Sequence, residues 1–452
     1  MYDGVRKLQR KETFARQKPQ FFMKKIIIRG GNKLNGNIHI EGMKNAALPI
    51  IFASVLVGEK CFIENIPDVN DINISLEILR NIGADIKFPK KNCIEIDTSN
   101  VVPCSSPYDL VSKMRGSTYL LGAELGRFGV SKVGWPGGCD FGTRPIDQHI
   151  KGFEALGATV VAEGGYINAS VVKNETDSGE VYSKNGLHGA RVFLDVASVG
   201  ATINVILAAT LADGVTVIEN AAREPHIVDL AGFLNTCGAD IMGAGTSVIK
   251  IRGVDKLHGC QYKIIPDMIE AGTYMTAVAA TGGCVSIQSV IPKHLETITA
   301  KLREMGVSVT EYEDSITVES DGNLKPVTVK TLPYPGFPTD MHPQFTVLLC
   351  LADGVGQITE NVWDNRYRYV DELHMMGAVI SVDGRTATVV GNGHLKGAPV
   401  KSVDLRAGAA LVIAGLAADG VTEISKTETI ERGYHNLVGK LRLLGADISK
   451  MQ

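Results

Sequence analysis

A short pattern centred on glycine recurs six times along this chain and restricts its fold more than any other feature. In each copy an apolar residue or a cysteine precedes the glycine, and an alanine or valine follows it; the glycines are Gly83, Gly157, Gly238, Gly306, Gly377 and Gly445. Successive glycines are 74, 81, 68, 71 and 68 residues apart. Regular self-similarity on this scale is typical of folds assembled from repeated supersecondary units. We therefore predict that the chain forms six similar units.

Each unit is predicted to have the order βαβαβ. A turn of the form L-x-G, as at 34–36, opens a short alternating strand, and an alanine-rich helix follows it. A second strand such as 215–220, a second helix such as 297–305 and a last strand complete the unit. The first helices, for example 201–212 and 407–418, are apolar on nearly every face, which is typical of buried helices. We therefore expect helices in the centre and sheets outside.

Six such units predict an α/β fold with two lobes, each an inside-out α/β barrel of three βαβαβ repeats. We expect residues 45–252 to form one lobe, and residues 23–44 together with 253–452 to form the second. The ligand site is expected in the cleft between the lobes. Residues 1–22 are basic and polar and lack the apolar core of a signal peptide, so they are predicted to be a disordered leader or an added extension.

The repeat also aligns the starts of the six first helices. Counting back 14 residues from the glycine that ends each helix gives these positions: Lys44, Arg115, Gly200, Met268, Asp340 and Arg406. Ser198 and Asp267 lie beside the two uncharged positions. A cation at a helix N-terminus slightly destabilises its own helix, so its recurrence at equivalent places indicates a function, most simply the binding of an anion. The alternatives are solvated charges on exposed turns and, for Asp340, a simple helix cap.

The segment 135–145 is rich in glycine and proline and carries Cys139 five residues before Arg144. A thiol beside a fixed cation has a lowered pKa, which suits a proton donor or nucleophile near neutral pH. The alternative is a small buried side chain at a tight turn. Arg432 and Arg366 each follow a second strand, where they could reach the cleft or pair with a neighbouring acid at the surface.

Composition excludes several classes of protein. The net charge of −3 gives no global attraction to nucleic acid, and no stretch approaches the 18 apolar residues of a membrane span. The eight cysteines form no C-x-x-C pair and the ten histidines have no metal-ligand spacing, so we expect reduced thiols in a cytoplasmic protein without a metal site. Neither a P-loop nor a dinucleotide-binding glycine motif is present.

Six motifs together carry a family resemblance. They are Lys44-Asn45-Ala46-Ala47-Leu48-Pro49, Pro136-Gly137-Gly138-Cys139, Arg144-Pro145-Ile146-Asp147, Phe337-Pro338-Thr339-Asp340-Met341, Asp404-Leu405-Arg406 and Glu431-Arg432-Gly433-Tyr434. With them the chain, from about Met23 to its end, resembles the UDP-N-acetylglucosamine 1-carboxyvinyltransferases, enolpyruvyl transferases of the EPSP synthase-like superfamily. The resemblance implies transfer of the enolpyruvyl group of phosphoenolpyruvate to the 3-hydroxyl of UDP-N-acetylglucosamine, the first committed step of peptidoglycan synthesis. It also implies the inside-out barrel and no cofactor.

The resemblance implies roles for particular residues. The catalytic residues would be Cys139, Asp340, Lys44 and Arg432. Phosphoenolpyruvate would be bound by Lys44, Asn45, Arg144, Arg406 and Arg432. UDP-N-acetylglucosamine would be bound by Arg115, Arg144, Pro145, Ile146, Asp147, Gln148, Ser198, Val199, Asp340 and Val362. Cys139 would donate a proton and be the site of covalent inhibition by fosfomycin, while Asp340 would accept the proton of the sugar hydroxyl.

Two features depart from the family pattern. Some members carry a lysine at the position of Val196, and residues 173–188 form a longer polar insert than in many relatives. Two other functions remain open: a shikimate-pathway enolpyruvyl transferase, against which the Cys139 loop argues, and a sugar-nucleotide sensor without turnover.

Overall fold

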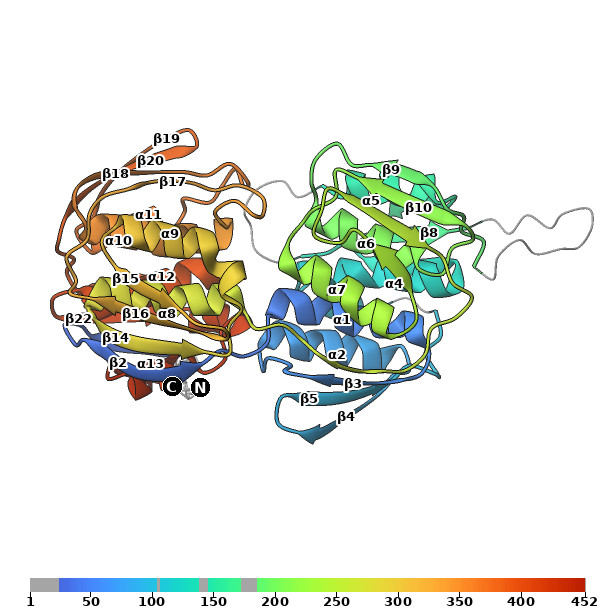
Figure 1. Ribbon diagram of the computed structural model, residues 1–452, viewed down its shortest axis with the longest axis horizontal. Coiled ribbons are helices and arrows are strands. Elements are labelled where there is room, and N and C mark those ends of the chain that lie inside the picture. The colour runs from blue at the N-terminus through green and yellow to red at the C-terminus, as the bar shows by residue number, and fades with distance from the viewer. Residues whose placement is uncertain (1–23, 104–105, 138–144, 172–184, 452) are drawn as a thin grey trace, which may run out of the picture.

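The computed structural model describes residues 24–103, 106–137, 145–171 and 185–451. Its elements gather into two lobes that lie side by side (Figure 1). Each lobe holds three sheets around a group of helices, and the described residues form five four-stranded sheets and one three-stranded sheet. The leader 1–22, together with Cys139 and Arg144, lies outside the described residues. The two-lobed α/β fold predicted from the repeats is confirmed.

The first lobe contains three units. The first has α1 (Lys44–Val57), α2 (Asn70–Asn81), β3 (Lys60–Glu64), β4 (Asp85–Lys90), β5 (Cys93–Asp97) and β13 (Gln261–Lys263). The second has α3 (Tyr108–Val111), η1 (Arg115–Thr118), α4 (Tyr119–Phe128), β6 (Val130–Gly134), α5 (Asp147–Ala155), β7 (Thr159–Glu163) and β8 (Tyr166–Ser170). The third has β9 (Arg191–Phe193), α6 (Val199–Ala209), β10 (Val215–Glu219), α7 (Pro225–Thr236), β11 (Asp240–Met242) and β12 (Val248–Arg252).

The second lobe repeats this plan. Its first unit has β2 (Leu34–His39), α8 (Met268–Thr281), β14 (Gly283–Gln288), η2 (Pro292–Leu295), α9 (Glu296–Glu304), β15 (Ser308–Glu311) and β16 (Ser315–Ser320). The next has β17 (Thr328–Lys330), η3 (Thr339–Met341), α10 (His342–Leu351), β18 (Asp353–Thr359), α11 (Val370–Met375), β19 (Val379–Asp383) and β20 (Thr386–Asn392). The last has β1 (Lys25–Arg29), β21 (Pro399–Lys401), α12 (Leu405–Ala417), β22 (Val421–Ser425), η4 (Thr427–Arg432), α13 (Leu437–Leu443) and β23 (Asp447–Met451).

Five of the six units have one strand more than predicted, whereas the described residues of the second unit form the three strands β6, β7 and β8. In the third unit the order is β11-β12-β10-β9, with β9 parallel to β10 and with β12 antiparallel to both β10 and β11. The single last strand expected from the sequence is therefore a hairpin, and Gly243 and Gly245 adopt the positive φ angles of its turn. A hairpin lets the chain return beside β10, so the unit has the order βαβαββ.

The first helix of each unit lies in the interior of its lobe. Helices α1, α4 and α6 pack together in the first lobe, and α8, α10 and α12 pack together in the second. In α12 every residue from Leu405 to Leu416 is buried, as the all-round apolar pattern predicted. Glycine allows close packing: a Cβ on Gly126 of α4 would lie 2.6 Å from the Leu207 oxygen of α6. Within the described ranges no helix combines the length and the apolar character needed to span a membrane.

The chain crosses between the lobes at two neighbouring places. Strand β2 pairs with β14 of the second lobe, and β13 pairs with β3 of the first. The residues between the two crossings therefore belong to the first lobe, and those before and after them belong to the second. The crossing segments, 40–43 and 264–267, bond to each other: the Met43 amide donates to the Ile265 oxygen at 2.8 Å, and the Asp267 amide to the Glu41 oxygen at 2.9 Å. The lobe limit at residue 252 stays a prediction, and the β13 pairing favours a later one, after Lys263.

Candidate active site

Lys44 and Arg432 contact the same buried carboxylate. Lys44 is the first residue of α1, and its Nζ lies 3.2 Å from Asp71 Oδ2. Arg432, the last residue of η4, donates from Nε to Asp71 Oδ1 at 2.9 Å and from Nη2 to Oδ2 at 3.4 Å. Because α2 belongs to the first lobe and η4 to the second, Asp71 joins the two lobes through this ion pair.

Asp71 stays ionised despite its burial. Burial alone would raise the pKa of this carboxyl group, but Lys44 and Arg432 outweigh it and hold the pKa below the usual value. The three side chains leave a formal charge of +1 in a region where water is largely excluded. Such a cluster attracts an anion, and Lys44 and Arg432 can exchange part of their contact with Asp71 for contact with that anion.

A second carboxylate, Asp340, is held between two buried arginines. Arg406 donates from Nε to Asp340 Oδ2 at 3.0 Å, and Arg366 Nη2 lies 3.4 Å from Oδ1. Burial would raise the pKa of Asp340, yet Arg406, Arg366 and Lys44 together lower it to about 2. The effect of Lys44 shows that the Asp71 cluster and the Asp340 cluster lie within electrostatic reach of each other. Residues 44, 340, 406 and 432 therefore converge on one region.

Arg406 is fixed by its surroundings. Asp404 caps α12 by accepting from the amides of Arg406 and Ala407 at 2.8 and 2.9 Å, and the Tyr434 ring lies under the guanidinium at 5.2 Å. Burial would lower the pKa of Arg406, but Tyr434 and Asp340 raise it, so the guanidinium keeps its charge. Among the described residues, Arg406 Nη1 has no hydrogen-bond partner although it is buried. An anionic ligand could accept this hydrogen bond.

The other predicted residues of the first lobe lie around the starts of three helices. Arg115 begins η1 and donates from Nη2 to the Pro145 oxygen at 3.2 Å, which brings it to the segment that leads into α5. Ile146 and Asp147 start α5, and Gln148 exchanges hydrogen bonds with Asp195. Burial, with the charge of Arg115 as a second cause, lowers the pKa of His149 to about 4, so this histidine is neutral.

The remaining predicted residues also lie at element ends. Ser198 caps α6 by accepting from the Ala201 amide at 3.3 Å, and Val199 is the first residue of that helix. Val362 follows β18, where its amide donates to Glu360 Oε1 at 2.8 Å. Asn45 is the second residue of α1, next to Lys44.

Three side chains that shape the site were not assigned a role from the sequence. Asp71 lies in the first turn of a helix, where an acid is ordinary because it complements the helix dipole. Buried Glu360 accepts from the hydroxyls of Thr331 and Thr339, next to Asp340, at 2.9 and 2.8 Å. Asp404 precedes Arg406 by two residues, and its role as the N-cap of α12 could have been recognised from the sequence. Arg366, expected at the cleft or at the surface, is buried against Asp340.

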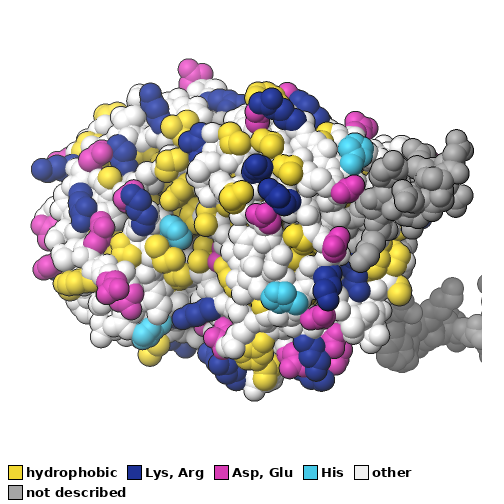
Figure 2. Space-filling model, turned by 45° about the vertical axis from the view of Figure 1, so that its right-hand side comes forward, with side chains coloured by type: hydrophobic (Ala, Val, Ile, Leu, Met, Phe, Trp, Pro, Cys, Tyr) yellow, Lys and Arg dark blue, Asp and Glu magenta, His cyan; other side chains and the backbone are white. Residues whose placement is uncertain are grey.

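The face of the molecule shown in Figure 2 has no single basic field. Figure 2 shows Lys and Arg side chains interspersed with Asp and Glu over the face turned to the viewer. The attraction for an anion therefore comes from the local clusters around Asp71 and Asp340, as the small net charge of −3 requires.

Comparison with known proteins defines the class of protein first. Residues 28–441 match the family model described as EPSP synthase (3-phosphoshikimate 1-carboxyvinyltransferase). The enolpyruvyl transferase NikO from Streptomyces tendae superposes with a TM-score of 0.84 at 27% identity, over 95% of this chain and 99% of that one. EPSP synthase from Acinetobacter baumannii, at 20% identity, shares the fold with a TM-score of 0.73 over 95% of this chain and 100% of its own. The chain belongs to the EPSP synthase family.

Closer relatives narrow this assignment. UDP-N-acetylglucosamine 1-carboxyvinyltransferase from Clostridium botulinum is 53% identical over 430 residues, which are 95% of this chain and 100% of that protein. UDP-N-acetylglucosamine 1-carboxyvinyltransferase 3 from Caldanaerobacter subterraneus subsp. tengcongensis is 52% identical with the same coverage. Within the EPSP synthase family the chain thus falls among the UDP-N-acetylglucosamine 1-carboxyvinyltransferases, which confirms the resemblance seen in its motifs.

Proposed function

We propose that this enzyme transfers the enolpyruvyl group of phosphoenolpyruvate to the 3-hydroxyl of UDP-N-acetylglucosamine and releases phosphate. The observation that carries the proposal is the convergence of Lys44, Arg432, Arg406 and Asp340 from both lobes, in a chain whose relatives bear the name of this activity. Those relatives favour UDP-N-acetylglucosamine over shikimate 3-phosphate as the acceptor. The reaction is the first committed step of peptidoglycan synthesis.

The proposed phosphoenolpyruvate site matches the charges of its substrate. Phosphoenolpyruvate carries a phosphate and a carboxylate on three carbons, so several fixed cations must surround it. Lys44 and Arg432, held by Asp71, would bind one anionic group, and Arg406 would donate its unpartnered Nη1 to the other. Asn45 and Arg144 complete the proposed set, although Arg144 lies outside the described residues.

The chemistry requires an acid and a base on opposite sides of the donor double bond. Asp340 would take the proton of the sugar hydroxyl as its oxygen bonds to carbon 2, while Cys139, which lies outside the described residues, would protonate carbon 3. Loss of a proton from carbon 3 then restores the double bond as the C–O bond to phosphate breaks. A pKa of about 2 leaves Asp340 ionised at neutral pH, as a base must be. Release of Arg406 toward the substrate would raise the basicity of Asp340 once substrate is bound.

The sugar nucleotide would lie across the first lobe. Arg115, Arg144, Pro145, Ile146, Asp147, Gln148, Ser198, Val199, Asp340 and Val362 are the residues proposed to hold it. The start of α6 supports this placement, since amides in the first turn of a helix suit the diphosphate. Arg115 already reaches Pro145, so these segments can act together.

Phosphate release tests the proposal and separates the alternatives. Enzyme mixed with phosphoenolpyruvate should release phosphate with UDP-N-acetylglucosamine and not with shikimate 3-phosphate. Release with shikimate 3-phosphate alone would assign the chain to the shikimate pathway, and release with neither acceptor would leave a sugar-nucleotide sensor. Fosfomycin should add once to the wild-type chain and not to Cys139→Ala, as measured by intact mass.

The cellular setting follows from the same proposal. None of the six cysteines within the described ranges forms a disulfide, which supports a cytoplasmic location. Cell-wall synthesis in turn would link the enzyme to cell shape, the cell cycle and division. The substrates are its proposed small-molecule partners, and no nucleic-acid partner is proposed.

A further inference from the structure

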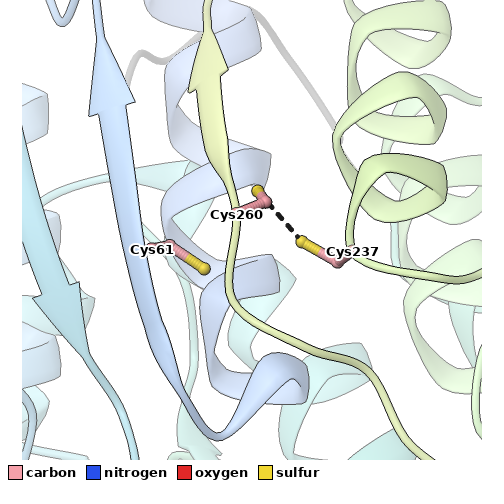
Figure 3. A group of neighbouring side chains, drawn as sticks. All are labelled: Cys61, Cys237 and Cys260. Atoms are coloured by element: carbon pink, nitrogen blue, oxygen red, sulfur yellow. Dashed lines mark hydrogen bonds between the residues drawn. The ribbon is translucent and has the colours of Figure 1, made fainter.

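Three cysteines from distant parts of the chain meet in the first lobe. Cys61 lies in β3, Cys237 follows the end of α7, and Cys260 directly precedes β13. Their sulfur atoms all lie within 4.8 Å of one another, and the Cys237 thiol donates to Cys260 Sγ at 3.2 Å. Figure 3 shows Cys61 and Cys237 directed, from opposite sides, toward the segment that carries Cys260.

The backbone holds these three thiols in place. Cys61 and Cys237 are fully buried, and Cys260 is half-buried. The Phe62 amide donates to the Cys260 oxygen at 2.8 Å, and the His258 amide donates to the Cys237 oxygen at 2.9 Å. The cluster is therefore formed by the fold itself, and its open side is at Cys260.

We propose that Cys61, Cys237 and Cys260 bind a thiophilic cation such as Zn²⁺, with His258 as the fourth protein ligand. Tetrahedral zinc with Zn–S bonds of about 2.3 Å needs sulfur atoms about 3.8 Å apart. The three sulfur atoms already approach this spacing, so small side-chain rotations are sufficient. Binding forms three Zn–S bonds and releases the three thiol protons to solvent, without any oxidation or reduction.

His258 lies next to the cluster, but its ring nitrogens are not within 4.8 Å of all three sulfur atoms, so the ring must move toward them to complete the ligand set. Its Nδ1 lies 3.1 Å from the Gly259 oxygen, a backbone contact that leaves Nε2 for a metal. Nε2 lies 3.2 Å from the position that a Cβ would take on Gly238, the residue after Cys237. Glycine there lets the imidazole approach the end of α7. Three cysteines and one histidine are a common zinc ligand set.

Metal titration of the reduced full-length chain tests this proposal. A Cys139→Ala background removes the proposed catalytic thiol, and a chelator removes any metal before ZnCl₂ is added under anaerobic calorimetry. We expect one tightly bound Zn²⁺ per chain and a rise in the midpoint of thermal unfolding. Co²⁺ in the same site should give a sulfur-to-cobalt charge-transfer band. Cys260→Ser should abolish both the tight binding of one Zn²⁺ per chain and the cobalt charge-transfer band. His258→Gln should weaken the affinity for Zn²⁺ by about 10–100-fold.

Matched controls separate the site from general thiol chemistry. Cys284→Ser removes an exposed thiol outside the cluster and should still bind one Zn²⁺ tightly per chain. Circular dichroism must show that Cys260→Ser is folded; Cys260 is chosen because it is less buried than Cys61 or Cys237. Absence of tight binding in the folded, reduced protein would overturn the proposal, as would equal binding by Cys260→Ser. A Cys237–Cys260 disulfide that resists reductant would overturn it too.

Discussion

Replacing Asp71 by asparagine should weaken the joint between the lobes while preserving the shape of the side chain. The variant loses the negative charge that Lys44 and Arg432 share, so two cations remain close together with one neutral amide between them. Asparagine fills the same volume, so no cavity accompanies the change. The expected effect is therefore electrostatic.

The structure sets the size of this effect. The side chains of Lys44, Asp71 and Arg432 are 9%, 5% and 22% exposed, so solvent screens the contacts little. Removing one partner from a buried ion pair costs about 3–5 kcal/mol, because the other charge stays buried without compensation. We expect the free energy of unfolding of Asp71→Asn to fall by about this amount.

Urea unfolding followed by circular dichroism measures this loss. Inorganic phosphate should restore part of the stability of Asp71→Asn and act less on the wild type, because a bound anion replaces the missing charge. Asp447→Asn is the matched control: its partner Arg29 lies at 3.6 Å on the surface, so a change below about 0.5 kcal/mol is expected. If Asp71→Asn were as stable as the wild type, or gained no more from phosphate than the wild type does, the account of this cluster would be wrong.

Three further predictions concern single side chains. Cys139→Ala should lose phosphate release while Cys284→Ala keeps it, and equal activities would reject the thiol as the proton donor. Arg406→Ala should lower turnover or raise the apparent requirement for phosphoenolpyruvate far more than Arg29→Ala, and steady-state kinetics with the opposite ranking would contradict the assignment. Burial raises the pKa of Glu124 from 4.5 to about 7, so its neutral form favours folding below pH 4.5 and this contribution is lost as pH rises to about 7. Glu124→Gln should therefore be more stable than the wild type at pH 8 by up to about 3 kcal/mol, at about 1.4 kcal/mol per pKa unit, and a difference in unfolding free energy that does not change with pH would refute this.

The local parts of the fold could be predicted from the sequence. The interior helices were recognised because burial on all sides leaves an apolar pattern within one segment, as in α12. Lys44 and Arg406 were found at helix starts because the repeat aligns equivalent positions without any knowledge of the lobes. The hairpins that end the first five units were missed because a turn as short as that between β11 and β12 leaves little signal beside the stronger glycine pattern. In the last unit the extra strand is β1, from the other end of the chain.

Long-range features could not be predicted. Which lobe takes β2 or β13 depends on pairing with strands far away in the sequence, and nothing in these short strands identifies the partner. In the sequence Asp71 is an ordinary acidic residue at a helix start. Its role as a link between the lobes comes from its contact with Arg432, which is 361 residues away along the chain. The three clustered cysteines likewise lack metal-ligand spacing, so the sequence predicted no metal site and only the fold brings them together.

The double crossing leaves the first lobe as one continuous piece of chain, residues 44–263, and divides the second lobe between residues 24–39 and 268–451. A fragment of residues 45–252 would lack β13 and would expose the edge of β3, so it should self-associate rather than fold as an independent unit. A single protease cut within 40–43 would leave the halves covalently tied through 264–267. Two adjacent connecting segments also allow the lobes to rotate about the axis that joins the segments, while they resist twisting of one lobe against the other.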